Sequence, residues 1–390
     1  MYISSMANSL LGQAMFKVLA RAKELERNGR EILHFEIGEP DFDTPENIKN
    51  AAIKALREGE TNYVNTAGIP ELREAISGEI EKTRGFKPDI DQILVGPGVN
   101  PMIYLSLACV ADKGEEVILP DPGFPSYHAV IAALGLKPVY VPIKEENDFR
   151  LNPDDVAEFI TSKTKIIMMN SPQNPTGAVM SREDVRGLAD IAEDKNIYLF
   201  SDEIYSKLIY DAKHYTPAFK DGCNERTILV DGFSKAYAMT GWRLGYCVGP
   251  KELVYKMELL LQTIVSCTPP FIQYGGIEAL EGSQDFVSNM REDYRKRRNV
   301  IIPGLNRIPG FKCVYPQGAF YAFPNIRRTG MKSDELSELL LDKVGVATIP
   351  GTAFGPGGEG YIRFSYATSL EDIKKALERI GNLMDEIGIE

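Results

Sequence analysis

The sequence is poor in the residues that hold metals and disulfides. Its 390 residues include only five cysteines and three histidines, and both types are scattered along the chain. An odd number of cysteines with no Cys-x-x-Cys pair argues against a disulfide framework and favours reduced thiols in the cytoplasm. No group of histidines and cysteines has the spacing of a zinc site, so we expect no metal.

Long apolar runs and an excess of positive charge are also missing. No stretch approaches the roughly 20 uninterrupted apolar residues of a membrane-spanning helix. Lysine and arginine number 44 against 55 aspartates and glutamates, which gives a formal net charge of −11. This balance weighs against nucleic acid or an anionic membrane as a partner. The first 30 residues lack the features of a signal peptide, and their pattern predicts an amphipathic helix.

Short apolar runs alternate with helical patterns through the middle of the chain. This alternation predicts an α/β fold with a largely parallel sheet, which binds ligands beyond the carboxyl ends of its strands. Strands are expected at 92–95, 116–120, 138–142, 165–170, 197–202, 227–233 and 244–249, and helices between them at 100–111, 125–134, 153–161 and 181–195.

The two ends of the chain predict a second unit. Residues 250–300 have the pattern of long helices, and the chain from 311 onward mixes strand and helix patterns. We therefore expect a large domain with a mixed, mostly parallel sheet flanked by helices, plus a smaller α/β domain built from the N- and C-terminal segments. The expected boundaries are an N-terminal segment at 1–45, the large domain at 46–280 and the small domain at 281–390.

Polar residues follow three of the expected strands. Asn174 lies in a rigid turn with two prolines, Asp202 ends a strand with Tyr205 three residues later, and Ser234 and Lys235 end another. If the three strands share one sheet, these side chains converge on a single crevice.

This set of residues suits one cofactor in particular. A lysine with a lowered pKa is a nucleophile whose amine forms Schiff bases with carbonyls, and a lysine with an acidic partner marks pyridoxal phosphate. Asp202 can face the ring nitrogen, and Arg243 suits the phosphate. Taken singly, however, these residues also have ordinary interpretations as a surface lysine, a helix N-cap and a surface ion pair, so spacing alone leaves both interpretations open.

Motifs along nearly the whole chain resemble those of class I and II aminotransferases, in the fold type I superfamily of pyridoxal-phosphate enzymes. They occur in a fixed order: IGEPDFDTP (37–45), NYVNTAGIPELREAI (62–76), PDPGFPSY (120–127), NSPQNPTG (170–177), SDEIY (201–205), FSKAYAMTGWRLGY (233–246), GAFYAF (318–323) and YIRFSYA (361–367).

The resemblance implies a role for each residue around the cofactor ring. Lys235 binds the cofactor aldehyde and later moves the α-proton, and Asp202 pairs with the pyridinium nitrogen. Asn174 and Tyr205 contact the phenolic oxygen, and Phe124 stacks on the ring.

The resemblance also implies a phosphate site, which is formed by Gly98, Val99, Asn100, Ser234 and Arg243. Two residues depart from the family pattern. Val99 stands where relatives often have Ser, Thr or Lys, and Pro101 stands where they have a small residue. The backbone contacts to the phosphate survive this change, whereas a contact from a side-chain hydroxyl to the phosphate is lost. In some relatives, a lysine at the position of Val99 binds the distal carboxylate of the substrate.

The substrate site and the assembly follow from the same resemblance. Arg363 is expected to clamp the substrate α-carboxylate together with Asn174, and Gly38 allows the backbone to approach that group. The family residue matching Tyr63 reaches the phosphate of the partner subunit, which implies a homodimer.

The predicted function is therefore a pyridoxal-phosphate-dependent amino acid aminotransferase with ping-pong transfer to 2-oxoglutarate or pyruvate. The expected donors are aspartate, alanine or an aromatic amino acid. A C–S β-lyase or a related elimination enzyme shares the same lysine, aspartate and arginine and stays open as the alternative. A nicotinamide dehydrogenase is disfavoured because the chain has no G-x-G-x-x-G after a first strand. A DNA-binding regulator is disfavoured because the motifs begin almost at the start of the sequence.

Overall fold

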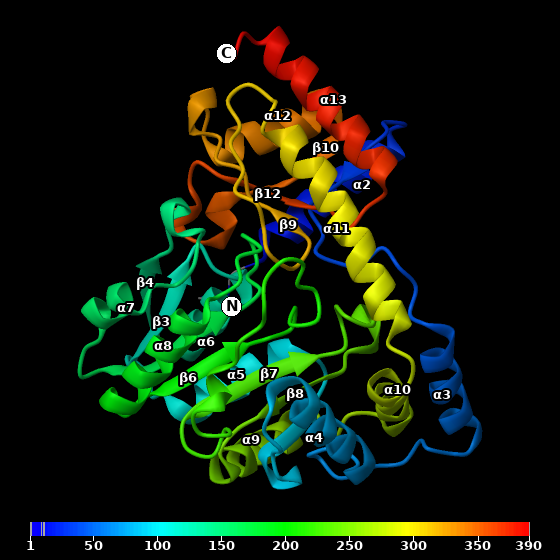
Figure 1. Ribbon diagram of the computed structural model, residues 1–390, viewed down its shortest axis with the longest axis vertical. Helices are drawn as coiled ribbons and strands as arrows, with labels where there is room; N and C mark the ends of the chain where they lie inside the picture. The colour runs from blue at the N-terminus through cyan, green and yellow to red at the C-terminus, as the bar shows by residue number, and fades with distance from the viewer. Residues whose placement is uncertain (1, 9, 11, 390) are drawn as a thin grey trace.

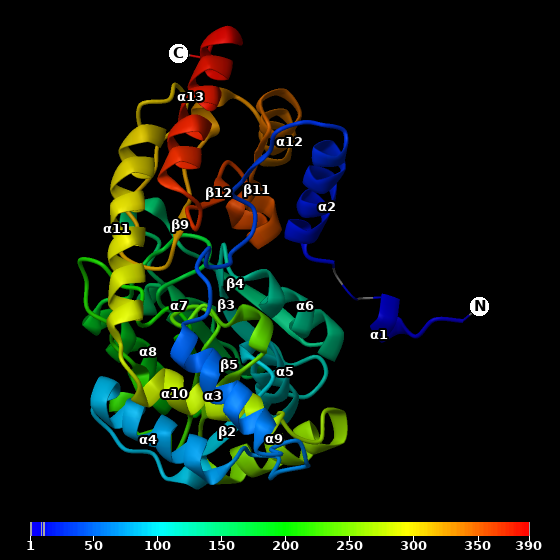
Figure 2. The same cartoon turned by 90° about the vertical axis from the view of Figure 1, so that its right-hand side faces the viewer.

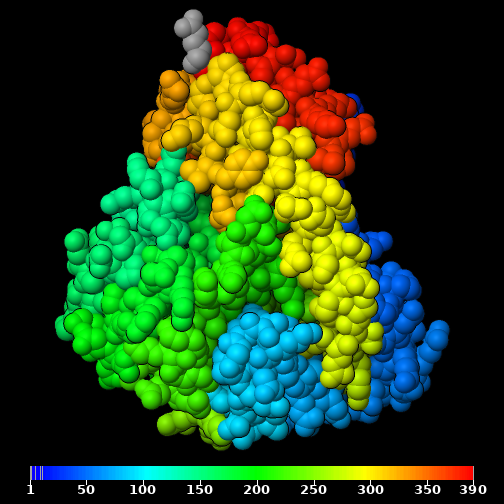
Figure 3. Space-filling model, viewed as in Figure 1, coloured from blue at the N-terminus to red at the C-terminus, as the bar shows by residue number. Residues whose placement is uncertain are grey.

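The computed structural model describes residues 2–8, 10 and 12–389. Figure 1 shows two layers of structure, with the larger unit below and the smaller one above. The long helix α11 (Asp285–Leu305, yellow) runs along both units (Figures 1 and 3). None of the helices in the described ranges combines the length and the apolar character needed to cross a membrane.

The larger unit is built on a seven-stranded sheet. Strands β3 to β7 are parallel, and β8 runs antiparallel to both of its neighbours. The predicted α/β fold with a mostly parallel sheet is confirmed. The strand order is β2 (Ile93–Gly96), β8 (Gly245–Val248), β7 (Thr227–Gly232), β6 (Tyr198–Asp202), β5 (Thr164–Asn170), β3 (Glu116–Asp121) and β4 (Lys137–Pro142).

Helices cover both faces of this sheet, and its strands are therefore apolar on both sides. In β5, Ile166 and Met168 pack on one side, and Ile167 and Met169 pack on the other. The first side is covered by α5 (Val99–Val110), α6 (Pro125–Leu134) and α9 (Lys251–Ile264). The second side is covered by α7 (Pro153–Phe159), α8 (Arg182–Lys195), α4 (Pro70–Arg84) and α10 (Pro270–Glu281), with α3 (Glu46–Arg57) packed on α10.

The smaller unit joins the two ends of the chain. Strand β1 (Leu33–His34) pairs in parallel with β10 (Val346–Ala347). A three-stranded antiparallel sheet has the order β11 (Ile349–Pro350), β12 (Ile362–Ser365) and β9 (Tyr321–Ala322), with α12 (Ser333–Val344) and α13 (Leu370–Glu386) beside it. Because the two ends of the chain pair in the smaller unit, we propose the domain division predicted from the sequence, with boundaries at residues 45 and 280.

The N-terminal segment departs from the predicted single helix. It forms a four-residue helix, α1 (Ser5–Asn8), and a separate helix, α2 (Ala14–Arg27). Figure 2 shows α1 outside the two units on the side of α6, whereas α2 lies against the smaller unit. The start of α2 thereby reaches the junction between the two units.

Candidate active site

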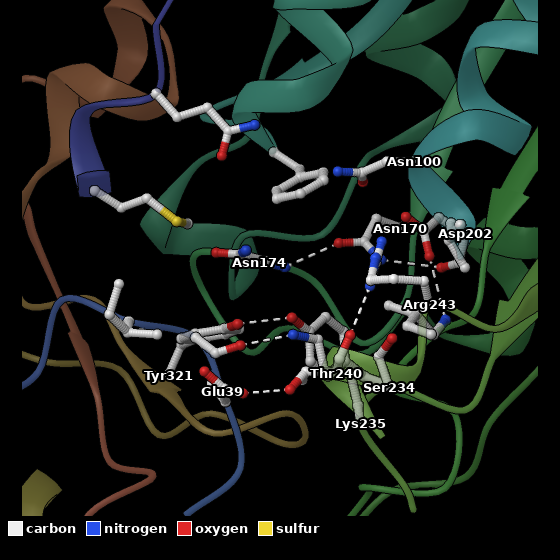
Figure 4. A pocket seen from close by; sticks show the side chains of 18 of the residues that line it. Glu39, Asn100, Asn170, Asn174, Asp202, Ser234, Lys235, Thr240, Arg243 and Tyr321 are labelled. Carbon is white, nitrogen blue, oxygen red and sulfur yellow. Dashed lines mark hydrogen bonds between the residues drawn. The ribbon is translucent and has the colours of Figure 1, made fainter. Parts of the chain in front are cut away.

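A cavity of about 270 Å³ lies at the carboxyl ends of β5, β6 and β7 (Figure 4). These parallel strands run in register, with Asn170 opposite Asp202 and Asp202 opposite Val230, so their ends meet at one edge. The structure brings together ten residues predicted from the sequence as the lining of this cavity: Gly38, Val99, Asn100, Phe124, Asn174, Asp202, Tyr205, Ser234, Lys235 and Arg243.

Asp202 is a buried carboxylate with two hydrogen-bond donors. The hydroxyl of Tyr127, on α6, donates to Oδ2 at 2.7 Å, and the backbone N–H of Ile204 donates to Oδ1 at 3.2 Å. Burial raises the pKa of Asp202 to about 6, against the opposing effect of the Tyr127 hydrogen bond. The carboxylate therefore lies in an environment where a cationic partner would strongly stabilise its charge.

Lys235 follows β7 and directs its amine into the same cavity. Its Nζ donates a hydrogen bond of 2.6 Å to the carbonyl oxygen of Gly38 (Figure 4). Removal of the amine from bulk water is the main cause that lowers the pKa of Lys235 to about 8; Glu39 opposes this effect, and the charges of Arg363 and Arg243 add to it. A large fraction of this amine is therefore neutral near pH 8.

Arg363, on β12, is fully buried next to the cavity without lining it. Its Nη1 donates to Asn174 Oδ1 at 3.2 Å, and its Nη2 donates to the carbonyl oxygen of Glu36. The guanidinium lies between two rings, 4.7 Å from the Tyr321 centroid and 5.1 Å from that of Phe354. Its buried Nε has no hydrogen-bond partner among the described residues, so this group has spare capacity to donate.

The other end of the cavity is suited to an anion. Helix α5 begins at Val99, and its first N–H groups have no partners within the helix. Gly98 has a φ of +93°, and a Cβ placed there would lie 2.5 Å from Nη2 of Arg243. The positive φ therefore favours glycine at this position, and a larger residue would displace the Arg243 guanidinium.

Gly38 is needed for a similar reason, because a Cβ at this position would overlap the hydroxyl of Tyr321. That hydroxyl lies 2.6 Å from the hydroxyl of Tyr205. Phe124 lines the cavity, and its ring packs edge-on to Tyr127, with the centroids 5.5 Å apart. Tyr63, in contrast, is 87% exposed and does not line the cavity of its own chain.

Sequence reasoning missed several residues of this site. Tyr127, Asn170, Thr240 and Tyr321 lie inside motifs that were recognised, so the motifs themselves were the available signal. Residues 13–16 precede the first motif, and the helical pattern predicted for the first 30 residues did not mark them as part of the site. The missed residues that line the cavity are Gln13, Met15, Phe16, Ile37, Glu39, Asn170, Ile204, Thr240 and Tyr321.

The sheet and the groups at its carboxyl edge define an enzyme of the fold type I class, which uses pyridoxal phosphate. The model of the family described as aminotransferase class I and II matches residues 30–380, and the chain belongs to this family.

Individual relatives agree with this assignment. The chain is similar to an aspartate aminotransferase of Pyrococcus horikoshii, with 44% identity over 372 residues covering 95% of this chain and 94% of the relative. It is also similar to the aromatic-amino-acid aminotransferase 2 of Thermococcus litoralis, with 44% identity and coverage of 91% and 92%. A solved aspartate aminotransferase from Thermus thermophilus with maleate superposes with a TM-score of 0.94 at 38% identity, covering 98% of this chain and all of the other. The protein is a pyridoxal-phosphate-dependent aminotransferase.

The residues around the cavity fit this cofactor. An aldehyde, a pyridinium nitrogen and a phosphate need an amine, a carboxylate and an anion site, respectively. Lys235 supplies the amine, Asp202 supplies the carboxylate, and the helix start beside Arg243 supplies the anion site. Among the described residues, no group of three or more metal-ligating side chains could hold a metal ion.

Proposed function

We propose that this enzyme moves the α-amino group of an amino acid to a 2-oxo acid in a ping-pong cycle, with Lys235 as its central residue. The observation that carries the proposal is the meeting of Lys235 and Asp202 in one cavity beside the buried Arg363. The names of the relatives suggest aspartate or an aromatic amino acid as the donor. Alanine is a third candidate, and the acceptor is 2-oxoglutarate or pyruvate.

The cofactor would be held at three points. Lys235 binds the aldehyde, Asp202 pairs with the pyridinium nitrogen, and Phe124 stacks on the ring. Asn174 and Tyr205 donate hydrogen bonds to the phenolic oxygen.

The phosphate would be held at the far end of the cavity. Ser234 donates its hydroxyl, Arg243 donates a charge-assisted pair of N–H groups, and the backbone from Gly98 to Asn100 supplies the start of a helix. Val99 adds no side-chain hydrogen bond to this group.

When bound, pyridoxal phosphate acts as an electron sink for negative charge that develops at the α-carbon of the substrate. Asp202 keeps the sink effective because its carboxylate stabilises the proton on the ring nitrogen. The amine of Lys235 has a pKa of about 8, which suits a general base near neutral pH. The amine can therefore accept the proton from the α-carbon of the substrate and later return a proton toward the cofactor.

Arg363 orients the substrate for this proton transfer. The rings of Tyr321 and Phe354 fix the plane of the guanidinium, and the Nε of Arg363 is free to donate to the α-carboxylate. Asn174 holds Nη1, and Gly38 leaves room beside the carboxylate. Lysine cannot offer the same fork of donors.

We propose a homodimer in the cytoplasm. The exposed ring of Tyr63 is available to a second copy of the chain, where it would contact the phosphate of the other site. The five cysteines are all free thiols, which suits a reducing compartment.

The test separates transfer from elimination on the same site. The holoenzyme is incubated with amino acids and either 2-oxoglutarate or pyruvate, and new amino acid is measured. We expect stoichiometric transfer, and we expect Arg363→Lys to lower kcat/KM for every donor by roughly 10²-fold or more. Pyruvate and ammonia released from cystathionine without an acceptor, in the absence of transfer, would instead identify a lyase.

A further inference from the structure

A buried carboxylate joins the two units of the chain. Asp121 ends β3 in the larger unit and is 5% exposed. The backbone N–H of Gly357, in the smaller unit, donates to its Oδ1 at 3.0 Å and to its Oδ2 at 2.9 Å. Gly357 lies in the short 3-10 turn η7 (Pro356–Gly358). The carboxylate therefore holds a loop of one unit against a strand of the other.

The loop of the smaller unit is shaped to fit this carboxylate. A Cβ at Gly355, where φ is +121°, would overlap Oδ1 of Asp121. A Cβ at Gly357 would lie 2.9 Å from Cγ of the same side chain. A second hydrogen bond crosses the junction nearby, because the N–H of Gly123 donates to the carbonyl oxygen of Phe354 at 2.7 Å. The two segments are therefore in close backbone contact around Asp121.

Asp121 is buried without a cation to balance its charge. In the described part of the chain, the N–H of Gly357 is the one hydrogen-bond partner of its side chain. Burial raises the pKa of Asp121, and the hydrogen bond from Gly357 opposes this effect. A buried carboxylate without an ion partner is less favourable for stability than a neutral side chain of similar size. Stability alone therefore does not account for an aspartate at this position.

Both segments that Asp121 joins carry residues of the proposed mechanism. Phe124 follows three residues after Asp121 and lines the cavity, where it would stack on the cofactor ring. In the smaller unit, Phe354 ends the 3-10 turn η6 (Gly351–Phe354), and its ring centroid lies 5.1 Å from the guanidinium of Arg363. Phe354 is 1% exposed and closely packed, so a shift of its loop would also shift the arginine.

We propose that Asp121 is a positioning residue for Arg363, and that it acts through η7 and Phe354. The inference rests on the proposed function, in which Arg363 binds the substrate α-carboxylate beside a cofactor ring held by Phe124. Because Asp121 fixes the loop of the smaller unit to β3, it sets the distance between the guanidinium and the ring that a bound amino acid has to span. Loss of this contact should weaken the binding of every amino acid, whatever its side chain.

The first half-reaction of the holoenzyme tests this role. Cofactor absorbance is followed with phenylalanine and with aspartate, which gives KM and the limiting rate for each donor. Asp121→Ala should raise KM roughly tenfold for both donors and change the limiting rate less than about threefold, because Arg363 holds the α-carboxylate before and during the reaction. Asp121→Asn keeps an acceptor oxygen for the Gly357 N–H and should restore KM to within about threefold of the wild type. The affinity for pyridoxal phosphate should change less than about twofold in both variants.

A second variant tests the same contact from the smaller unit. Gly357→Ala adds a Cβ that presses on Asp121 and should raise KM as Asp121→Ala does, so it decides the matter even if Asp121→Ala does not fold. Asp221→Ala is the control for the carboxylate, because Oδ2 of Asp221 accepts from two backbone N–H groups at 3.0 Å where β7 begins, away from the cavity. Gly381→Ala, in α13 with open space at its Cβ position, is the control for the glycine. Neither control should change KM.

A double-mutant cycle separates positioning from a merely structural role. Arg363→Lys lacks the fork of donors that Asp121 positions, so adding Asp121→Ala to it should change KM less than about twofold further. Equal losses with and without Arg363→Lys, or a limiting rate and a cofactor affinity that fall as much as KM rises, would contradict the inference.

The outcomes also separate this inference from the proposed function. If Arg363→Lys lowers kcat/KM for every donor while Asp121→Ala and Gly357→Ala leave KM unchanged, the inference is wrong and the proposed function stands. If Arg363→Lys itself has no effect on any donor, the proposed role of the arginine fails, and the inference fails with it.

Discussion

The hydroxyl of Tyr127 lies 2.7 Å from Oδ2 of Asp202, and both side chains are buried at the carboxyl end of β6. Tyr127 comes from α6, on one face of the sheet, and Asp202 ends a central strand. This hydrogen bond favours the ionised form of a carboxylate whose pKa burial raises to about 6. Tyr127 is therefore a positioning residue for Asp202.

Tyr127→Phe removes this donor and keeps the ring. The pKa of Asp202 should then rise above its present value, so the acidic limb of the pH profile of kcat/KM should move to higher pH. We expect kcat/KM at neutral pH to fall by roughly tenfold, the effect of one hydrogen bond to a charged group. A variant with an unchanged pH profile would show that the tyrosine only fills space.

Gly98→Ala tests the phosphate end of the cavity. The added Cβ meets Arg243 at a position where φ is +93°. We expect the affinity for pyridoxal phosphate to fall by at least about tenfold, equivalent to about 1.4 kcal/mol. Gly59→Ala is the control, because Gly59 has a φ of +88° but open space around its Cβ position. Equal losses in the two variants, measured by titration of the apoenzyme, would remove the specific role of Gly98.

Arg84 holds together two buried carboxylates behind the cavity. Its Nε lies 3.1 Å from Glu203 and its Nη2 lies 2.5 Å from Asp231, and its side chain is 2% exposed. Arg84→Met leaves both carboxylates without this partner and should lower the free energy of unfolding by about 3–5 kcal/mol. The exposed pair between Arg21 and Glu24 provides the control. Arg21→Met should cost less than about 1 kcal/mol in the same urea titration.

His34 links α2 to β1 in a pH-dependent manner. Its Nδ1 lies 2.7 Å from buried Glu36, and its Nε2 lies 3.0 Å from Glu26. The Glu36 contact is the main cause that raises the pKa of His34 to about 9, from an ordinary value of 6.5. The protonated imidazole therefore stabilises the folded state fully below pH 6.5, and this contribution is lost as the pH rises through about 9.

His34→Gln should accordingly lower the free energy of unfolding by about 1–2 kcal/mol at pH 6, a value reduced for partial exposure to solvent. At pH 10 the wild type and the variant should differ much less, because the imidazole is then neutral in both folded and unfolded wild type. Urea unfolding of both proteins at pH 6 and pH 10 measures this difference in free energy. An equal difference at the two pH values would mean that the charge on His34 contributes nothing.

The sequence predicted those parts of the fold that depend on local pattern. The run Ile166–Met169 is apolar at every position, and a strand buried on both faces requires this. Asn174, Asp202 and Lys235 could be grouped because parallel strands end at one edge. These residues lie in the structure where strand ends meet.

Other parts could not be predicted because they depend on contacts between distant segments. Strand β1 has two residues and pairs with β10 more than 300 residues later, so it has no periodic signal of its own. The position of Met15 and Phe16 depends on how Ala22 and Leu25 pack against the smaller unit. The hydrogen bond between Tyr127 and Asp202 likewise joins two elements whose spacing only the folded sheet determines.

The most direct test of the central claim is borohydride reduction of the holoenzyme, followed by mapping of the modified peptide by mass spectrometry. The account predicts that the cofactor is fixed to Lys235, and that Lys235→Ala abolishes both this modification and transamination. Modification of another lysine, or a Lys235→Ala protein that transaminates at the wild-type rate, would contradict it.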